Sequence, residues 1–134
     1  RIVFENKKKK IELEEILHPR VFESEKLKYE SIRKKHPKAL VIVDAALLIE
    51  SENYKNMDKV VVVDSDEKTR INRIQARNKM SLDEVVARMK NQMPGEEKKQ
   101  YADFILENSL DKDKLREQVK DLNTKLSLLA VENI

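Results

Sequence analysis

Two aspartates follow short apolar runs, at positions where a carboxylate can do chemistry. Asp44 ends the run 39–44, and Asp64 ends the run 59–64. If both runs are strands of a parallel sheet, both carboxylates lie at its carboxyl edge, where such sheets bind ligands. An acidic side chain there can hold Mg²⁺ through water, which is the functional interpretation of Asp44. A strand-ending aspartate that caps the next turn explains the same pattern, so the pattern alone leaves both interpretations open.

Arginines that can bind phosphate follow the second apolar run. Arg73 and Arg77 are four positions apart and share a helix face, Arg70 precedes them, and Arg88 lies in the next expected helix. The planar guanidinium group can hold two phosphate oxygens and stays charged. Arginines on a helix–turn–helix after a strand suit a lid that closes over ATP phosphates and excludes water. Each arginine could instead pair with a neighbouring carboxylate.

The elements that must position these side chains are predicted from apolar patterns. The runs 39–44 and 59–64 are short, continuous and rich in β-branched residues, which is typical of strands covered on both faces. The segment "DFILEN", residues 103–108, is expected to form a third strand. Strands separated by helical connections indicate an α/β architecture with a parallel sheet.

Helices are expected around these strands. Residues 7–35 have helical periodicity, but Pro19 predicts a kink or two abutting helices. Ser65 is expected to cap the helix that ends near Asn78. The next helix is expected to begin at Ser81, which forms a capping box with Glu84. Two further helices are expected at 96–101 and 111–131. The last has apolar residues at alternating spacings of four and three over about two heptads, which favours a helix packed on the sheet over a coiled coil. These residues are Leu115, Val119, Leu122, Leu126 and Leu129.

The composition excludes several classes of protein. The chain has 134 residues, of which 40% are hydrophobic and 40% charged, so it can form a core and is not typical of disorder. No apolar run is long enough for a membrane helix. The net charge of +3 and the 4% aromatic content argue against a nucleic-acid partner. The chain has no cysteine and no visible signal peptide, and we expect it in the cytoplasm.

The order of motifs resembles the dephospho-CoA kinase family. The matching segments are "LxxILHP", "VDxxLLxE", "RxxxR", "QMPxEEKxxxAD" and a closing "IxxN", and together with "RIVFENKKKK" they extend from Arg1 to about Val119. The resemblance implies a P-loop kinase fold with a helical substrate domain and a helical lid. It also implies transfer of the γ-phosphate of ATP to the ribose 3′-hydroxyl of dephospho-CoA, with Mg²⁺ as a cofactor. ATP and dephospho-CoA are thus the expected partners.

The resemblance also suggests roles for single residues. Asp44 and Arg77 are the catalytic candidates, and Asp44 would contact Mg²⁺ through water. The nucleotide-binding candidates are Arg77, Arg88 and Asn108, and the substrate-binding candidates are His18, Leu47, Leu48 and Glu50. Lys98 and Asp103 match family positions for which structural ion pairs are the simpler explanation.

The resemblance implies three regions, with some departures from the family pattern. We expect a substrate-domain portion at 1–38, a nucleotide-binding core at 39–76 and 95–134, and a lid at 77–94. The family usually has proline at the position of Ala46, an aromatic residue at that of Ile49 and aspartate at that of Asn78. These changes could loosen the turn after Asp44 without removing the site.

A glycine-rich phosphate loop cannot be written from this sequence. Such a loop needs several glycines followed by Lys and Ser or Thr, whereas the chain has one glycine, Gly95, followed by Glu96. We therefore expect an incomplete fold, a fragment without the first strand and the P-loop, that is inactive alone and can associate with itself through an exposed sheet edge. The alternatives are a non-catalytic interaction module that uses the leucine-rich last helix, or another nucleotide kinase of the same fold.

Overall fold

The computed structural model describes residues 6–132, and residues 1–5 and 133–134 lie outside the described part. The start of the expected 1–38 region and the end of the expected core therefore carry no structural description. The chain divides into two compact units, residues 1–44 with 130–134 and residues 45–129. None of the helices in the described part has the length and hydropathy needed to cross a bilayer.

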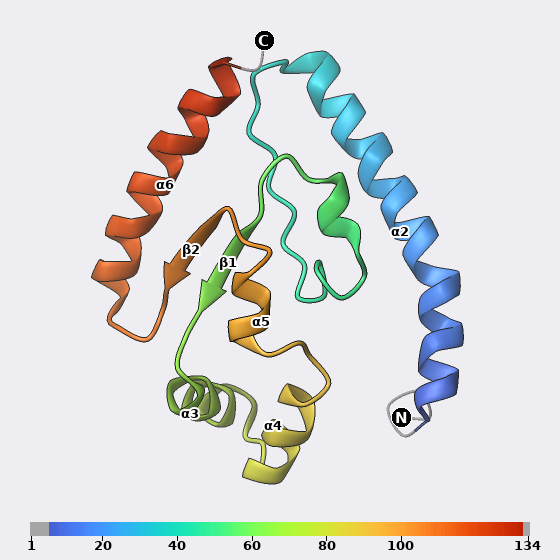
Figure 1. Cartoon of the computed structure of the whole chain (residues 1–134), viewed down its shortest axis with the longest axis vertical. Helices are drawn as coiled ribbons and strands as arrows, with labels where there is room; N and C mark the ends of the chain where they lie inside the picture. Colours follow the sequence, from blue (N-terminus) through green and yellow to red (C-terminus); the bar gives the residue numbers. More distant parts are fainter. Residues whose placement is uncertain (1–5, 133–134) are drawn as a thin grey trace. The chain divides into compact units, whose positions relative to one another are not determined.

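The first unit contains one long helix, α2 (Lys7–Lys35) (Figure 1). Its N-cap is Asn6, whose side chain accepts a hydrogen bond from the Lys9 N–H at 3.1 Å. The helix continues through Pro19, so the expected division into two helices is wrong. Proline removes one backbone donor, but Pro19 is exposed, and water can satisfy the carbonyl that this donor would have reached.

The expected strand at 39–44 is also wrong, because these residues form a loop in the described structure. Leu40 and Ile42 are 43% and 78% exposed, whereas a strand covered on both faces would bury them. A strand exists only where its backbone pairs with a neighbour, and the sheet of the described residues contains only β1 and β2.

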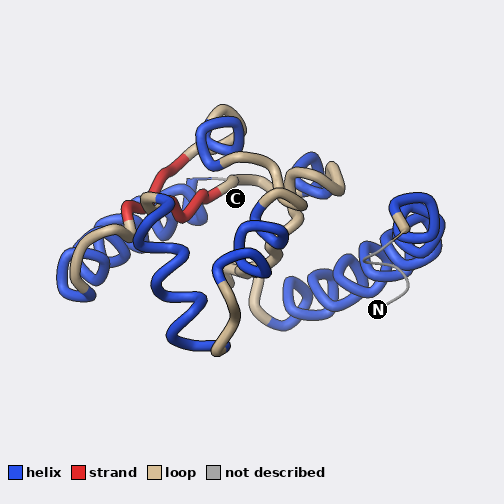
Figure 2. The backbone as a smooth tube through the Cα atoms, turned by 90° about the horizontal axis from the view of Figure 1, so that it is seen from below, coloured by secondary structure: helices blue, strands red, loops and turns tan. Residues whose placement is uncertain are grey.

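The second unit is built on two parallel strands, β1 (Val61–Asp64) and β2 (Phe104–Glu107), which confirms the α/β fold with a parallel sheet. The strands lie side by side in both views (Figures 1 and 2). Between them the chain forms α3 (Glu67–Asn78), α4 (Leu82–Met89) and α5 (Gly95–Lys99). A short 3-10 helix, η1 (Asn53–Asn56), precedes β1.

Each face of the sheet is covered over only one of its strands. Val62 lies in the main apolar cluster with Ile49 and Val60. The neighbour of Val62 on the same face, Ile105, is 49% exposed. On the other face Leu106 is buried, whereas Val63 beside it is 59% exposed. The expectation that both faces of the 59–64 strand are buried is therefore wrong for its second half.

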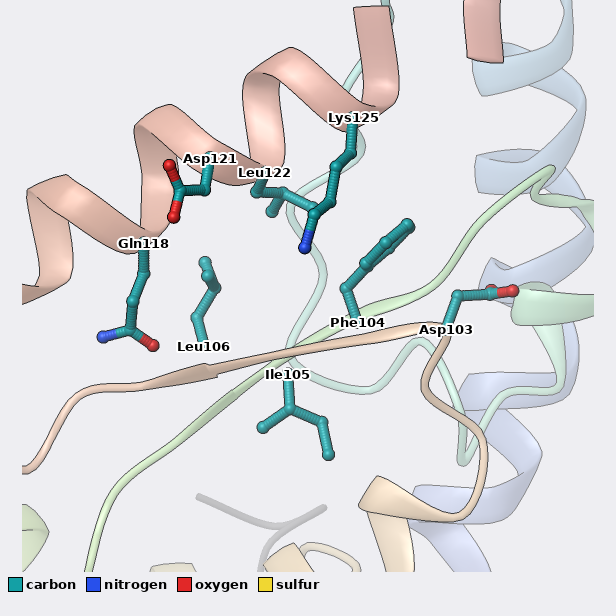
Figure 3. A pocket seen from close by; sticks show the side chains of 8 residues that line it. All are labelled: Asp103, Phe104, Ile105, Leu106, Gln118, Asp121, Leu122 and Lys125. Carbon is teal, nitrogen blue, oxygen red and sulfur yellow. The ribbon is translucent and has the colours of Figure 1, made fainter. Parts of the chain in front are cut away.

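The last helix, α6 (Lys112–Glu132), packs along β2 as expected. In Figure 3, Phe104 and Leu106 point towards this helix and Ile105 points away from it. The face towards the sheet includes Gln118, whereas Val119, which the leucine spacing had placed on that face, is 46% exposed. A cavity of about 320 Å³ remains between α6 and β2.

Candidate functional site

The loops that leave the two strands are tied together at the carboxyl edge of the sheet. The Asn108 N–H donates to the carbonyl of Asp64 at 2.7 Å. The Asp66 N–H donates to the hydroxyl of Ser109 at 2.8 Å. Asp66 is also the N-cap of α3, accepting from the Thr69 N–H at 2.8 Å, so the expected capping role of Ser65 is wrong. Ser65 is instead buried, at 8% exposure.

Arg73 holds the loop that follows β2. Its guanidinium donates to the carbonyl oxygens of Asn108 at 2.5 Å and Leu110 at 3.2 Å. Both backbone polar groups of Asn108 are therefore engaged, and the residue lies directly beyond the end of the sheet. Sequence reasoning identified the arginine but did not predict this structural role, since carbonyl acceptors leave no signal in a sequence.

Arg77 and Arg88 remain exposed on the hairpin formed by α3 and α4. Arg77 donates from Nε to the side-chain oxygen of Asn78 at 3.2 Å. Within the described residues, neither guanidinium has a carboxylate oxygen within 4.0 Å. Lys79 has a left-handed backbone conformation with φ 52°, and the expected capping box of Ser81 and Glu84 then starts α4. The hairpin thus carries two exposed guanidinium groups, of which Arg88 lies near enough to Glu84 for its charge to help lower the pKa of that carboxyl.

Asp64 has a partner that the sequence pattern did not suggest. Its Oδ2 lies 2.6 Å from Nζ of Lys99, and both side chains are mostly buried. The hydrogen bond that Lys99 donates to Asp64 raises the pKa of Lys99, with a smaller contribution from the one that it donates to Glu96. A Cβ atom at Gly95 would lie 2.9 Å from Oδ1 of Asp64, which explains why the single glycine of the chain stands there.

Glu50, a substrate-binding candidate, is engaged by the chain itself. Its Oε1 lies 2.9 Å from Nζ of Lys98 and accepts from the Met93 N–H at 3.0 Å. Burial opposes its ionisation, but these hydrogen bonds outweigh burial, so the pKa of Glu50 is lowered. Leu48 packs against the cluster around Ile49, and Leu47 is half-buried beside it.

The two residues for which ion pairing was preferred do form ion pairs. Lys98 pairs with Glu50 and also donates to the carbonyl of Ala46 at 3.0 Å. Asp103 lies 2.9 Å from Nζ of Lys59 and accepts from the Val60 N–H at 2.8 Å. The Val60 N–H and Lys59 together lower the pKa of Asp103.

The remaining candidates, Asp44 and His18, belong to the first unit. Asp44 is exposed in the loop at 39–45 and does not end a strand, contrary to expectation. His18 lies on α2 and stacks on Phe22, with ring centroids 5.6 Å apart. The described part of the chain contains no cluster of three or more side chains able to hold a metal ion.

Comparison with known proteins gives a consistent match. Residues 1–114 match the family model for dephospho-CoA kinase. A dephospho-CoA kinase of Clostridium perfringens is 39% identical over 120 residues, which cover 90% of this chain and 60% of that protein. The dephospho-CoA kinase of Leptospira interrogans is 39% identical over 125 residues, covering 93% of this chain and 59% of that protein. The chain thus spans about three fifths of the length of these relatives.

Solved structures agree with the sequence matches. The crystal structure of TT1252 from Thermus thermophilus has a TM-score of 0.75 and 32% identity, covering 94% of this chain and 64% of that chain. Dephospho-CoA kinase from Campylobacter jejuni has a TM-score of 0.61 and 34% identity, covering 94% of this chain and 62% of that chain.

Proposed function

This chain belongs to the dephospho-CoA kinase family, and on that premise we propose that it takes part in transferring the γ-phosphate of ATP to the ribose 3′-hydroxyl of dephospho-CoA. The observation that supports this most is the pair of exposed guanidinium groups, Arg77 and Arg88, on a hairpin that follows the carboxyl end of β1. Ligands of open parallel sheets bind beyond this edge.

Each candidate then has a chemical task. Arg77 and Arg88 would neutralise charge on the transferring phosphate, because a guanidinium can hold two phosphate oxygens at once. Asn108 would lie near the nucleotide base, since it follows β2 at the same edge of the sheet. The proposed substrate contacts are His18, Leu47, Leu48 and Glu50, with the protein acting in the cytoplasm and without a nucleic-acid partner.

Mg²⁺ is the proposed cofactor, and Asp44 is its candidate contact. The donor set is compatible with this ion, because Mg²⁺ usually keeps several waters and needs only one or two carboxylates beside the substrate phosphates. Asp44 is exposed and can therefore reach a hydrated ion. When bound, Mg²⁺ would neutralise charge on the phosphates, while the chain itself would supply the arginines.

The interaction-module alternative has less support. It requires the apolar face of α6 for a partner, whereas Leu122 of that face already lies against β2 (Figure 3). Val119 and Leu128 remain exposed, at 46% and 62%, but they are only two positions on a long helix.

A chimeric enzyme tests the proposed function. This chain would replace the matching part of the Clostridium perfringens relative, and ADP release would be followed with dephospho-CoA as acceptor. We expect turnover by the chimera and none by the 134-residue chain alone, which has no glycine-rich phosphate loop. Arg77→Ala should lower kcat about 100-fold or more, as for other lost transition-state donors.

Arg116→Ala is the matched control, because the ion pair that Arg116 makes in the described structure is with exposed Asp113 on α6. It should leave turnover unchanged. A folded chimera without kinase activity, or equal activity of the Arg77→Ala variant, would reject the proposed function. Turnover by the isolated chain would reject the need for a phosphate loop.

A further inference from the structure

The α3–α4 hairpin makes few polar contacts with the rest of its unit between residues 74 and 92. In the described structure, each side-chain hydrogen bond of this segment reaches a partner at most four positions away. Val85 of α4 is fully buried, and Val86 and Met89 of the same helix are half-buried. The position of the hairpin must therefore be set largely by what holds its two ends.

At the entry end, Arg73 holds the hairpin to the loop after β2. Its two hydrogen bonds reach the carbonyl oxygens of Asn108 and Leu110. Because Asn108 in turn donates to Asp64 at the end of β1, this end is fixed to the sheet.

At the exit end, Glu50 and Lys98 form a second connection. Oε1 of Glu50 accepts from the Met93 N–H, directly after the hairpin, and lies 2.9 Å from Nζ of Lys98. Lys98 also reaches the Ala46 carbonyl. The side chains of Glu50 and Lys98 are only 21% and 17% exposed, so solvent screens this pair less than a surface pair. Oε2 of Glu50 is buried without a hydrogen-bond partner in the described part, so Oε1 makes all the described polar contacts of this carboxylate.

We propose that Glu50 and Lys98 are positioning residues that fix the return end of the α3–α4 hairpin and so determine where Arg77 and Arg88 lie. The positioning role rests on the proposed function only in one respect, which is that the ligand of the two arginines is a phosphate. Glu50 then acts through the hairpin, in addition to the substrate contact proposed for it. Removing either partner leaves the other charge partly buried and unpaired, which is costly, so the return end should detach.

A distance measurement tests this directly. The chain has no cysteine, so Asp83→Cys on α4 and Glu117→Cys on α6 place two spin labels selectively on exposed sites. The label-to-label distance reports the hairpin relative to the sheet, because α6 packs on β2. We expect Lys98→Met to broaden and shift this distance distribution, and Lys98→Arg to restore it, since arginine can still reach Glu50 and the Ala46 carbonyl.

Lys59→Met is the matched control for general destabilisation. It breaks the ion pair with Asp103 at the start of the strands, away from the hairpin. It should lower the midpoint of thermal unfolding while leaving the distance distribution unchanged. An equal broadening by Lys59→Met, or a wild-type distribution in folded Lys98→Met, would overturn the proposal.

If Lys98→Met does not fold, Glu50→Gln gives the same test. The amide keeps an acceptor for the Met93 N–H but loses the charge, so we expect a partial broadening, and an unchanged distribution would overturn the proposal. The labels report the hairpin whether or not the chain binds ATP. An inactive chimera therefore rejects the proposed function and leaves the positioning role of Glu50 and Lys98 standing. An unchanged distance distribution rejects the positioning role and leaves the proposed function standing.

Discussion

At the scale of single residues, two neighbouring lysines of α5 fix two different parts of the unit. Lys98 reaches Glu50 in the turn before η1, and Lys99 reaches Asp64 at the end of β1. A helix of five residues cannot be stable by itself. Its position follows from these two ion pairs and from the close approach of Gly95 to Asp64.

The close approach at Gly95 gives a prediction about stability. Gly95→Ala places a Cβ 2.9 Å from Oδ1 of Asp64, which Lys99 holds in place. Crowding of this kind costs about 1–3 kcal/mol, whereas alanine gains at most about 1 kcal/mol over glycine in a helix. We expect Gly95→Ala to lower the free energy of unfolding by up to about 2 kcal/mol, measured with urea.

Asp64→Ala supplies the matched background for this measurement. With the carboxylate gone, Gly95→Ala should be neutral or stabilising, because only the gain in helix propensity remains. If Gly95→Ala lowers the free energy of unfolding by the same amount in the wild-type and Asp64→Ala backgrounds, the contact with Asp64 is not what requires glycine at this position.

At the scale of elements, α6 closes the outer edge of the sheet with a single side chain. Gln118 accepts from the Glu107 N–H at 2.8 Å and donates to the Glu107 carbonyl at 2.9 Å. These two backbone groups lie on the outer edge of β2, where another strand could pair with it. Gln118 therefore both anchors α6 and protects an edge from pairing with another chain.

Gln118→Leu tests this edge. Both hydrogen bonds to Glu107 are lost, and each contributes about 0.5–1.5 kcal/mol net, so we expect the free energy of unfolding to fall by about 1–3 kcal/mol. Exposure of the edge should also increase self-association, measured by light scattering after size exclusion. Glu117→Leu is the control, because it adds the same apolar side chain at a position that is 70% exposed. An equal increase in self-association by Gln118→Leu and Glu117→Leu would contradict the role of Gln118 in protecting the edge of β2.

Local sequence signals predicted most elements, because capping and apolar patterns are properties of neighbouring residues. The capping box at Ser81 and the β-branched run ending at Asp64 both occur where expected. The prediction of a strand at 39–44 was wrong because a strand depends on a distant partner that its own sequence does not specify. The contacts of Glu50 and Gly95 could not be foreseen for the same reason, since they join positions far apart in the chain.

At the scale of the whole molecule, the described residues leave much apolar surface uncovered. The buried hydrophobic residues are Ile49, Val60, Val62, Val85 and Leu106, all in the second unit. The apolar side chains of α2, by contrast, are largely exposed, with Ile16 at 56% and Leu27 at 61%. Uncovered apolar surface of this extent marks interaction sites or favours aggregation.

Self-association through the open edge of β1 is the prediction at this scale. Val63 is 59% exposed on β1, whose outer edge pairs with no other strand in the described structure, so it is suited to contact another copy. We expect the chain to run above its 15.8 kDa monomer mass by size exclusion with light scattering, and Val63→Lys to shift it towards the monomer. Val119→Lys is the control, since it adds the same charge at an exposed position of α6. Dissociation by Val119→Lys alone would instead assign the association to α6, and a monomeric wild-type chain would contradict the argument from the exposed edge.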